Sequence, residues 1–256
     1  MRDFSVDGKL VGRPAINHGT TKVSTAQHYP IGTIYETHGR RFRYCCASEA
    51  VTGTHRGLVN QSLHGGDTGG GVYGVMGAIG TKAYEGDRSV IMANLANGNP
   101  QTLFPVDWFY GGTINFYIPH ADYTDLLSMR VSGSELASAT AIKIWLDEPL
   151  PCDIAVTVFT ECHASPYLNV GVTHSDQFSC VVVNYVELSV GDYFWGQTRG
   201  PCYVQRNVGV DTDARMKVFT TPGGIMEDAD TNDIRQAIGY ALTPNVSDGM
   251  VMLMLE

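Results

Sequence analysis

Six cysteines and eight histidines are the residues of this chain that could ligate a metal or act as nucleophiles. No two cysteines have the C-x-x-C spacing typical of structural zinc sites, and the histidines occur singly. Cys162 and His163 are adjacent, but neighbouring residues of a strand point to opposite faces, so the two cannot easily share a metal or form a nucleophile–base couple. The spacing therefore predicts no metal site and no cysteine nucleophile.

A glycine-rich segment, HGGDTGGG (64–71), raises the question of phosphate binding. A phosphate-binding loop needs a Lys-Ser/Thr pair after the glycines and a helix that begins there. The chain instead continues with VYGVMG, which supplies neither. We expect a flexible surface loop.

The acidic run EDADTND begins like a calcium-binding loop, with Asp228, Asp230 and Asn232 at alternate positions. An EF-hand loop then needs Gly at its sixth and Glu at its twelfth position, where this chain has Asp233 and Gly239. A solvated acidic turn is the default interpretation, and a calcium clip within a loop stays open.

Acid–base chemistry would need carboxylates or histidines with positioned partners. His120, Asp122 and Asp125 lie close together in sequence, but no nucleophile or partner accompanies them. The motifs G-x-S-x-G, G-x-G-x-x-G, H-E-x-x-H and the P-loop are all missing from the sequence. We predict that the protein is not an enzyme and has no catalytic residue, cofactor or bound metal. A glycosidase-like depolymerase stays open, because its carboxylates leave no local signature.

Charge is sparse and unevenly distributed. Only 17% of the 256 residues are charged, against about 25% in typical globular proteins. Much of the surface must therefore consist of neutral polar groups or be covered by other molecules, and the second option suits a subunit of an assembly. Residues 1–40 carry +2 and the rest of the chain −11, within a net charge of −9. An acidic body gains nothing from counterion release, and we predict no binding to nucleic acid. The basic start of the chain could lie against an acidic neighbour or be an ordinary soluble tail.

No run of 18 apolar residues is present, and residues 1–12 lack the apolar core of a secretory signal. We therefore expect that the protein is made in the cytoplasm and does not associate with a membrane.

The elements that position these residues are predicted to be strands. Residues 1–28 are polar and aperiodic, which predicts an extended arm that ends before Tyr29. Phe42, Tyr44 and Cys46 then alternate with Arg41, Arg43 and Cys45 in a strand pattern. Further short runs rich in β-branched and aromatic residues are bounded by turn residues: 89–96, 113–119, 141–146, 154–162, 180–188, 193–197, 202–208, 216–221 and 250–256.

Helix signals are confined to 122–129 and 232–239, each long enough for one short helical turn. The predicted fold is mainly β, an antiparallel β-sandwich or barrel with an extended N-terminal arm and little helix. We expect a β domain over 29–190 and a small barrel-like segment over 191–256 packed against it.

Within the last segment, glycines predict local geometry. Gly191-Asp192 and Gly200-Pro201 are expected to turn the chain, and Gly196 to allow close backbone approach. The run MVMLML (250–255) has apolar residues at every position, which predicts a strand buried on both faces.

Four segments of residues 29–256 together resemble head decoration proteins, also called cement or capsid-stabilising proteins, of tailed bacteriophages. The segments are YPIGTIYETHGRRFRYCCASEAVTGT (29–54), DWFYGGTINFYI (107–118) with AIKIWLDEPLP (141–151), GDYFWGQTRGPCYV (191–204) and IGYALTPNVSDGMVMLMLE (238–256). A Gly-aromatic-Trp-x-Gln-x-x-Gly-Pro segment and a Gly-x-Ala-Leu…Gly…Val-x-Leu-x-Leu ending recur in that family in this order. The cysteines and the length of the arm depart from the family pattern.

This resemblance implies a structural virion protein on the outer surface of an assembled capsid. It would bind the major capsid protein at seams between subunits, act as a homo-oligomer (dimer or trimer), and catalyse no reaction. The alternative is a carbohydrate-binding or host-attachment module of a tail or fibre, in which Trp108, Tyr110 and Trp195 would stack on sugars. A core position is favoured for these three because they lie in β-like runs.

The assembly context also bears on the cysteines. On the predicted strand, Cys46 shares the buried face of Phe42 and Tyr44, and Cys45 points outward with Arg41 and Arg43. An outward thiol beside arginines favours the thiolate and could meet another cysteine across a capsid seam. We therefore hypothesise an inter-subunit disulfide at Cys45 and, with less support, at Cys202. The alternative, with all six cysteines reduced and buried, stays open.

Overall fold

A computed structural model of the chain describes a set of ordered ranges separated by gaps. These are 5–6, 9–10, 19–60, 74–93, 104–119, 124–172, 180–205, 216–220, 225–228, 236–242 and 249–256. Every regular element within them is a β-strand, and all but one of the strand pairings are antiparallel. The predicted all-β class, an antiparallel sandwich or barrel, is confirmed.

The chain divides into two compact units. Residues Met1–Gln61 and Pro166–Glu256 form one, here named the split unit, and Ser62–Ser165 form the other, the inserted unit. The expected division into 29–190 and 191–256 is therefore wrong. Its physical reason is strand pairing, because the strand that begins at Tyr193 pairs with the strand Arg40–Cys46 in one sheet, whereas residues 62–165 close a barrel of their own.

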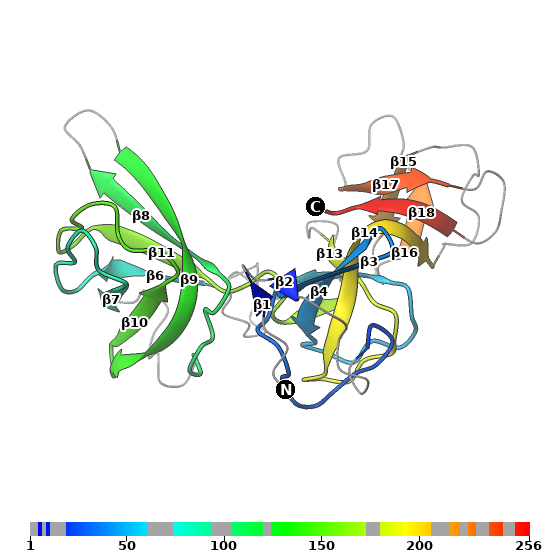
Figure 1. Cartoon of the computed structure of the whole chain (residues 1–256), viewed down its shortest axis with the longest axis horizontal. Helices are drawn as coiled ribbons and strands as arrows, with labels where there is room; N and C mark the ends of the chain where they lie inside the picture. Colours follow the sequence, from blue (N-terminus) through cyan, green and yellow to red (C-terminus); the bar gives the residue numbers. More distant parts are fainter. Residues whose placement is uncertain are drawn as a thin grey trace. The chain divides into compact units, whose positions relative to one another are not determined.

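Six strands of the inserted unit close that barrel (Figure 1, cyan and green). They are β6 (Gly74–Ile79), β7 (Ser89–Ala93), β8 (Thr113–Pro119), β9 (Thr124–Ser138), β10 (Ala141–Leu146) and β11 (Phe159–His163), in the closed order β10-β7-β6-β11-β8-β9. Alternate residues point inward, such as Ile114 and Phe116 of β8 and Ile142 and Ile144 of β10. Each buried side chain of this size stabilises the fold by roughly 1.5–3 kcal/mol relative to exposure.

Strand β9 replaces the helical turn expected at 122–129. Met129 and Val131 are buried, whereas Leu126, Ser128 and Arg130 are exposed. This period of two fits a strand between β8 and β10. The second expected helical turn, at 232–239, is also wrong where the structure describes it, because Ala237 begins a strand.

The split unit contains one twelve-stranded sheet. Its main path runs β1 (Ser5–Val6), β2 (Lys9–Leu10), β3 (Ile34–Thr37), β4 (Arg40–Cys46), β14 (Tyr193–Val204), β18 (Gly249–Met254), β17 (Ala237–Ala241), β15 (Met216–Thr220) and β16 (Ile225–Asp228). Off this path, β5 (Gly57–Asn60) pairs with β12 (Val170–Val172) and β13 (Cys180–Val183), and β13 pairs with β14.

Two cores lie against β4 and β14. An aromatic core contains Tyr29, Ile31, Tyr35, Phe42, Tyr44, Cys46 and Trp195. A second, largely aliphatic core contains Cys45, Ala47, Val51, Leu58, Val170, Val182, Leu188 and Phe194. Neighbouring residues of each strand, such as Phe194 and Trp195, enter different cores, so both faces of the sheet are buried here.

Strand β14 runs straight through the predicted turn at Gly200-Pro201, so that prediction is wrong. The register with β4 shifts between Gln197 and Arg199, and Gly200 has a φ of 92°, a conformation that favours glycine. The chain is therefore bulged within a strand rather than reversed. The turn at Gly191-Asp192 is confirmed, with the Asp192 amide donating to the Ser189 carbonyl at 3.1 Å.

Ordered structure begins earlier than the predicted Tyr29. Strand β2 joins β3 in parallel, and the backbones of Ser24 and Tyr193 exchange hydrogen bonds of 3.0 and 2.8 Å. The His28 amide donates to the Tyr44 hydroxyl at 3.1 Å. The described part of the predicted arm is thus attached to the sheet of the split unit, and the rest of residues 1–18 lies outside the described ranges.

Candidate functional site

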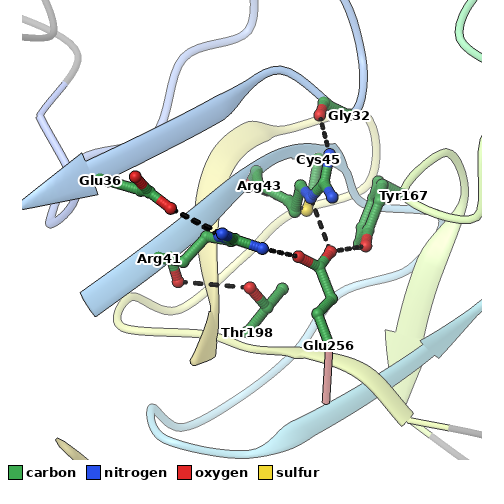
Figure 2. Close-up of polar contacts among 8 residues, drawn as sticks. All are labelled: Gly32, Glu36, Arg41, Arg43, Cys45, Tyr167, Thr198 and Glu256. Carbon is green, nitrogen blue, oxygen red and sulfur yellow. Dashed lines mark hydrogen bonds and ion pairs between the residues drawn. The ribbon is translucent and has the colours of Figure 1, made fainter. Parts of the chain in front are cut away.

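The side chain of Glu256, just beyond β18, joins three side chains of the split unit. Its Oε1 accepts a hydrogen bond from Arg43 Nε at 2.6 Å and its Oε2 one from Arg41 Nη1 at 3.2 Å (Figure 2). The Tyr167 hydroxyl also donates to this carboxylate. On its other side Arg41 pairs with Glu36, with an Nη2–Oε1 distance of 2.7 Å. Alternation along β4 places both arginines on one face, where they converge on Glu256.

Burial alone would raise the pKa of Glu256. Hydrogen bonds from Arg43, Tyr167 and Arg41 and the charge of Arg43 outweigh burial and hold this pKa below its usual range. Burial raises the pKa of Tyr167. The carboxylate therefore stays ionised near neutral pH. Such a group suits a structural contact that ties the residue after β18 to β4, rather than general acid–base catalysis.

A second buried network explains the Trp-x-Gln sequence of β14. The Gln197 side chain is fully buried, and its Oε1 accepts a hydrogen bond from the Tyr185 hydroxyl. Its Nε2 lies 2.8 Å from the Arg199 carbonyl and 3.1 Å from the Gly200 carbonyl. The amide thus satisfies backbone groups that the bulge leaves unpaired. Trp195 and Gln197 both hold the fold together.

The open face of β18 is apolar. Met250, Met252 and Met254 alternate outward, and the register sets Met252 between Pro201 of β14 and Tyr240 of β17. We name this surface the methionine face. Its members are Met250, Met252, Met254, Pro201, Tyr203, Tyr240 and Leu242. The exposed Arg199 of β14 lies directly opposite Met254 at one end of the face. Met254 is 56% exposed and Tyr240 43%, whereas Met252 is half-buried and Tyr203 packs against the His55 ring at one edge.

This face contradicts the prediction that MVMLML is buried on both sides. Val251 and Leu253 enter a core with Ile238, Cys202 and Val204, whereas the methionines stay outside. The sequence did carry a signal, since branched Val251 and Leu253 alternate with unbranched methionines. Both sets are apolar, however, so hydrophobicity alone did not separate the two faces.

The cysteines proposed for an inter-subunit disulfide are not at the surface. Cys45 is fully buried and Cys202 is 1% exposed. The predicted outward position of Cys45 is wrong because the second core covers that face of β4, and only Arg41 and Arg43 extend beyond its edge. Burial raises the pKa of Cys45, which opposes the expected thiolate. Cys46 is buried as predicted, and the exposed cysteine is Cys152.

The core position of Trp195 is confirmed, and Trp108 and Tyr110 are half-buried. Cys162 points inward and His163 outward on β11, on opposite faces as predicted. Asp125 is exposed on β9 and Asp228 ends β16. The glycine-rich loop 64–71, residues 120–123 and the acidic positions 229–235 lie outside the described ranges.

Among the residues that the structure describes, no three His, Cys, Asp or Glu side chains cluster in a way that could hold a metal ion. The same ranges contain no helix that could cross a membrane. Comparisons with protein-family models, with curated proteins and with solved structures found no match to this chain.

Proposed function

We propose that this protein is a structural virion protein that binds the outer surface of an assembled phage capsid and stabilises it at seams between major capsid subunits. The observation that carries the proposal is the methionine face, an apolar sheet surface on which Met250, Met254, Tyr240 and Leu242 are exposed. Large exposed apolar patches of this kind mark sites of protein–protein contact.

The composition of the face suits a shell partner. Methionine is unbranched and polarisable, so one methionine surface adapts to neighbours that differ slightly in shape. Quasi-equivalent seams present such neighbours. The aromatic core and the Gln197 network behind β14 fix the sheet, so few backbone degrees of freedom are lost on binding.

The proposed mechanism is thermodynamic. A ligand that binds only the assembled shell stabilises that state by RT ln(1 + [L]/Kd), and the effect is repeated at every occupied site. No catalysis is required. The proposed partners are the major capsid protein and further copies of this chain, as a dimer or trimer, on the capsid exterior.

Nucleic acid is an unfavourable partner because most of the negative charge lies on the inserted unit. The inserted unit contains eleven acidic and four basic residues and so carries −7 of the net −9. A unit of this sign repels a phosphate backbone.

The test is co-sedimentation of the purified protein with shells assembled from the major capsid protein of the same genome. Met254→Glu puts a charge on the face and is expected to weaken binding at least tenfold, with an unchanged melting temperature. Val190→Glu is the matched control, since Val190 is 70% exposed in the same unit but away from the face. Equal binding by wild type and Met254→Glu, or no binding to assembled shells at all, contradicts the proposal.

A further inference from the structure

The outer face of the inserted barrel carries aromatic and polar side chains that the proposed shell binding does not involve. Strands β6, β11, β8 and β9 are adjacent, and their outward residues form rows across the strands. In one row Phe159 lies between Ala78 and Tyr117. The next row contains Met76, Glu161, Asn115 and Ser128.

Two aromatic rings form a tilted platform on this face. The ring centroids of Tyr117 and Phe159 are 5.3 Å apart at an interplanar angle of 47°. The Phe159 side chain is 46% exposed. Leaving so much apolar area in water is unfavourable compared with placing the ring in the core. Such rings bury the apolar C–H face of a flat, amphipathic ligand.

Hydrogen-bonding groups lie one row away, and their orientation is fixed. The Tyr117 hydroxyl donates to Glu161 Oε2 at 2.8 Å, and the Ser128 hydroxyl donates to Asn115 Oδ1 at 2.6 Å. Among the described residues, no hydrogen-bond partner is found for Glu161 Oε1, which is an acceptor, or for Asn115 Nδ2, which is a donor. Glu161 and Asn115 are direct cross-strand neighbours, so these two groups lie side by side.

His163 completes the site. Its Nε2 is 3.6 Å from Glu161 Oε2, and its ring lies over Gly74, where a β-carbon would come within 2.7 Å of Nδ1. Gly74 therefore leaves room for an imidazole flat against the barrel.

We propose that this face, defined by Phe159, Tyr117, Glu161, Asn115 and His163, binds a pyranose ring of a neutral glycan. The sugar places its C–H face on the rings and its hydroxyls against Glu161 and Asn115, which match the paired donor and acceptor of each hydroxyl. Adjacent strands are about 4.8 Å apart, so four strands span about 14 Å, enough for one or two sugar rings. The net charge of −7 on the unit excludes acidic sugars as the preferred ligand.

The site differs from the sequence-based alternative of sugar stacking on Trp108, Tyr110 and Trp195. It also does not depend on the proposed shell partner, because it lies on the inserted unit and the methionine face lies on the split unit.

The experiment applies the full-length protein to an array of neutral and acidic glycans, followed by titration calorimetry with each retained neutral oligosaccharide at up to about 1 mM, a concentration that detects weak binding. Binding to neutral hexose-containing glycans but not to sialylated or uronic-acid glycans is expected. Phe159→Ala and Glu161→Gln are each expected to lower affinity about tenfold or more. Phe159→Tyr keeps the platform and should bind like wild type.

Trp145→Ala is the matched control. Trp145 is 39% exposed and lies on β10, which is opposite β11 in the closed strand order. Its removal should leave glycan affinity unchanged. The proposal is overturned if no neutral glycan is retained, if Phe159→Ala binds like wild type, or if Trp145→Ala causes the same loss.

Discussion

The thiols of this chain differ in their access to solvent. Cys152 is exposed, whereas the other cysteines are buried. Burial raises the pKa of Cys46 to about 11 and that of Cys202 to about 12, so both stay protonated near neutral pH. Because the thiolate is the reactive form, buried thiols of this kind react slowly. The protein thus behaves as a molecule with one available cysteine.

We expect a native thiol titration with Ellman's reagent to show one fast equivalent per chain, and six after unfolding in urea. Cys152→Ser should remove the fast phase and leave the slow one. A fast phase that persists in Cys152→Ser but disappears in Cys45→Ser would show that Cys45 is the exposed thiol, as the strand pattern predicted.

Glu256 should make stability depend on pH. Its pKa is lower in the folded chain than in the unfolded one, so its contribution is present above the unfolded value and is lost as pH falls through the folded value. Glu256→Gln should therefore lower the free energy of unfolding by roughly 1–3 kcal/mol at pH 7, with the difference shrinking below about pH 4.

Urea denaturation of both proteins across pH 3–7 measures this difference. Glu36→Gln is the control, because the Glu36 side chain is 34% exposed against 17% for Glu256, and solvent weakens the ion pair it makes with Arg41. A constant difference between wild type and Glu256→Gln at all pH values would show that the loss comes from packing and not from charge.

Strand β14 depends on a close contact at Gly196. A β-carbon there would lie 2.6 Å from Cβ of Val182, a core residue. Gly196→Ala should therefore destabilise the protein by roughly 1–3 kcal/mol. Val182→Gly removes the Cβ and both methyl groups that a β-carbon at Gly196 would meet, so the double variant should lose less than the sum of the two single losses.

Chemical denaturation of the four proteins in this cycle gives the coupling. Gly19→Ala serves as the control substitution, since a β-carbon at Gly19 meets nothing within 4 Å. If the losses in free energy of unfolding were additive in the double variant, the contact between positions 196 and 182 would not be the cause of the strain.

Strand positions were predictable where one face is apolar and the other is not. The runs 113–119 and 141–146 coincide with β8 and β10 because their alternation is regular. The segment DYTDLLSM did not predict β9, because two adjacent leucines fit a helical turn as well as a strand. Gly200-Pro201 has turn chemistry, but cross-strand pairing with Leu253 and Met252 keeps both residues within β14.

The candidate surfaces were hidden from the sequence for a different reason. Which face of MVMLML is covered depends on β14 and β17, and Phe159 meets Tyr117 only because β11 pairs with β8. Arg43 and Glu256 are likewise 213 positions apart. Local patterns predict that strands form, and they do not predict which distant strands become neighbours.

A buried amide side chain joins the two ends of the split unit between which the inserted unit lies in sequence, in addition to the pairing of β5 with β12. Asn60 is fully buried at the end of β5, and its Nδ2 donates to the carbonyls of Pro166 at 3.0 Å and Leu168 at 2.7 Å. The two ends of the split unit that flank Ser62–Ser165 are therefore close together in space. Adjacent ends of this kind allow an inserted domain to be removed without strain.

Replacing Ser62–Ser165 by a linker of about six glycine and serine residues should leave the split unit folded, since its sheet and its cores contain residues of that unit alone. The shortened protein should keep a cooperative thermal transition and the shell binding that Met254→Glu weakens, and should lose all glycan binding. Adding Asn60→Leu to it should destabilise the junction by roughly 1–3 kcal/mol, because two partly buried carbonyls lose their donor. An unfolded product would show that the inserted unit is required for the sheet, and retained glycan binding would move the saccharide site to the split unit.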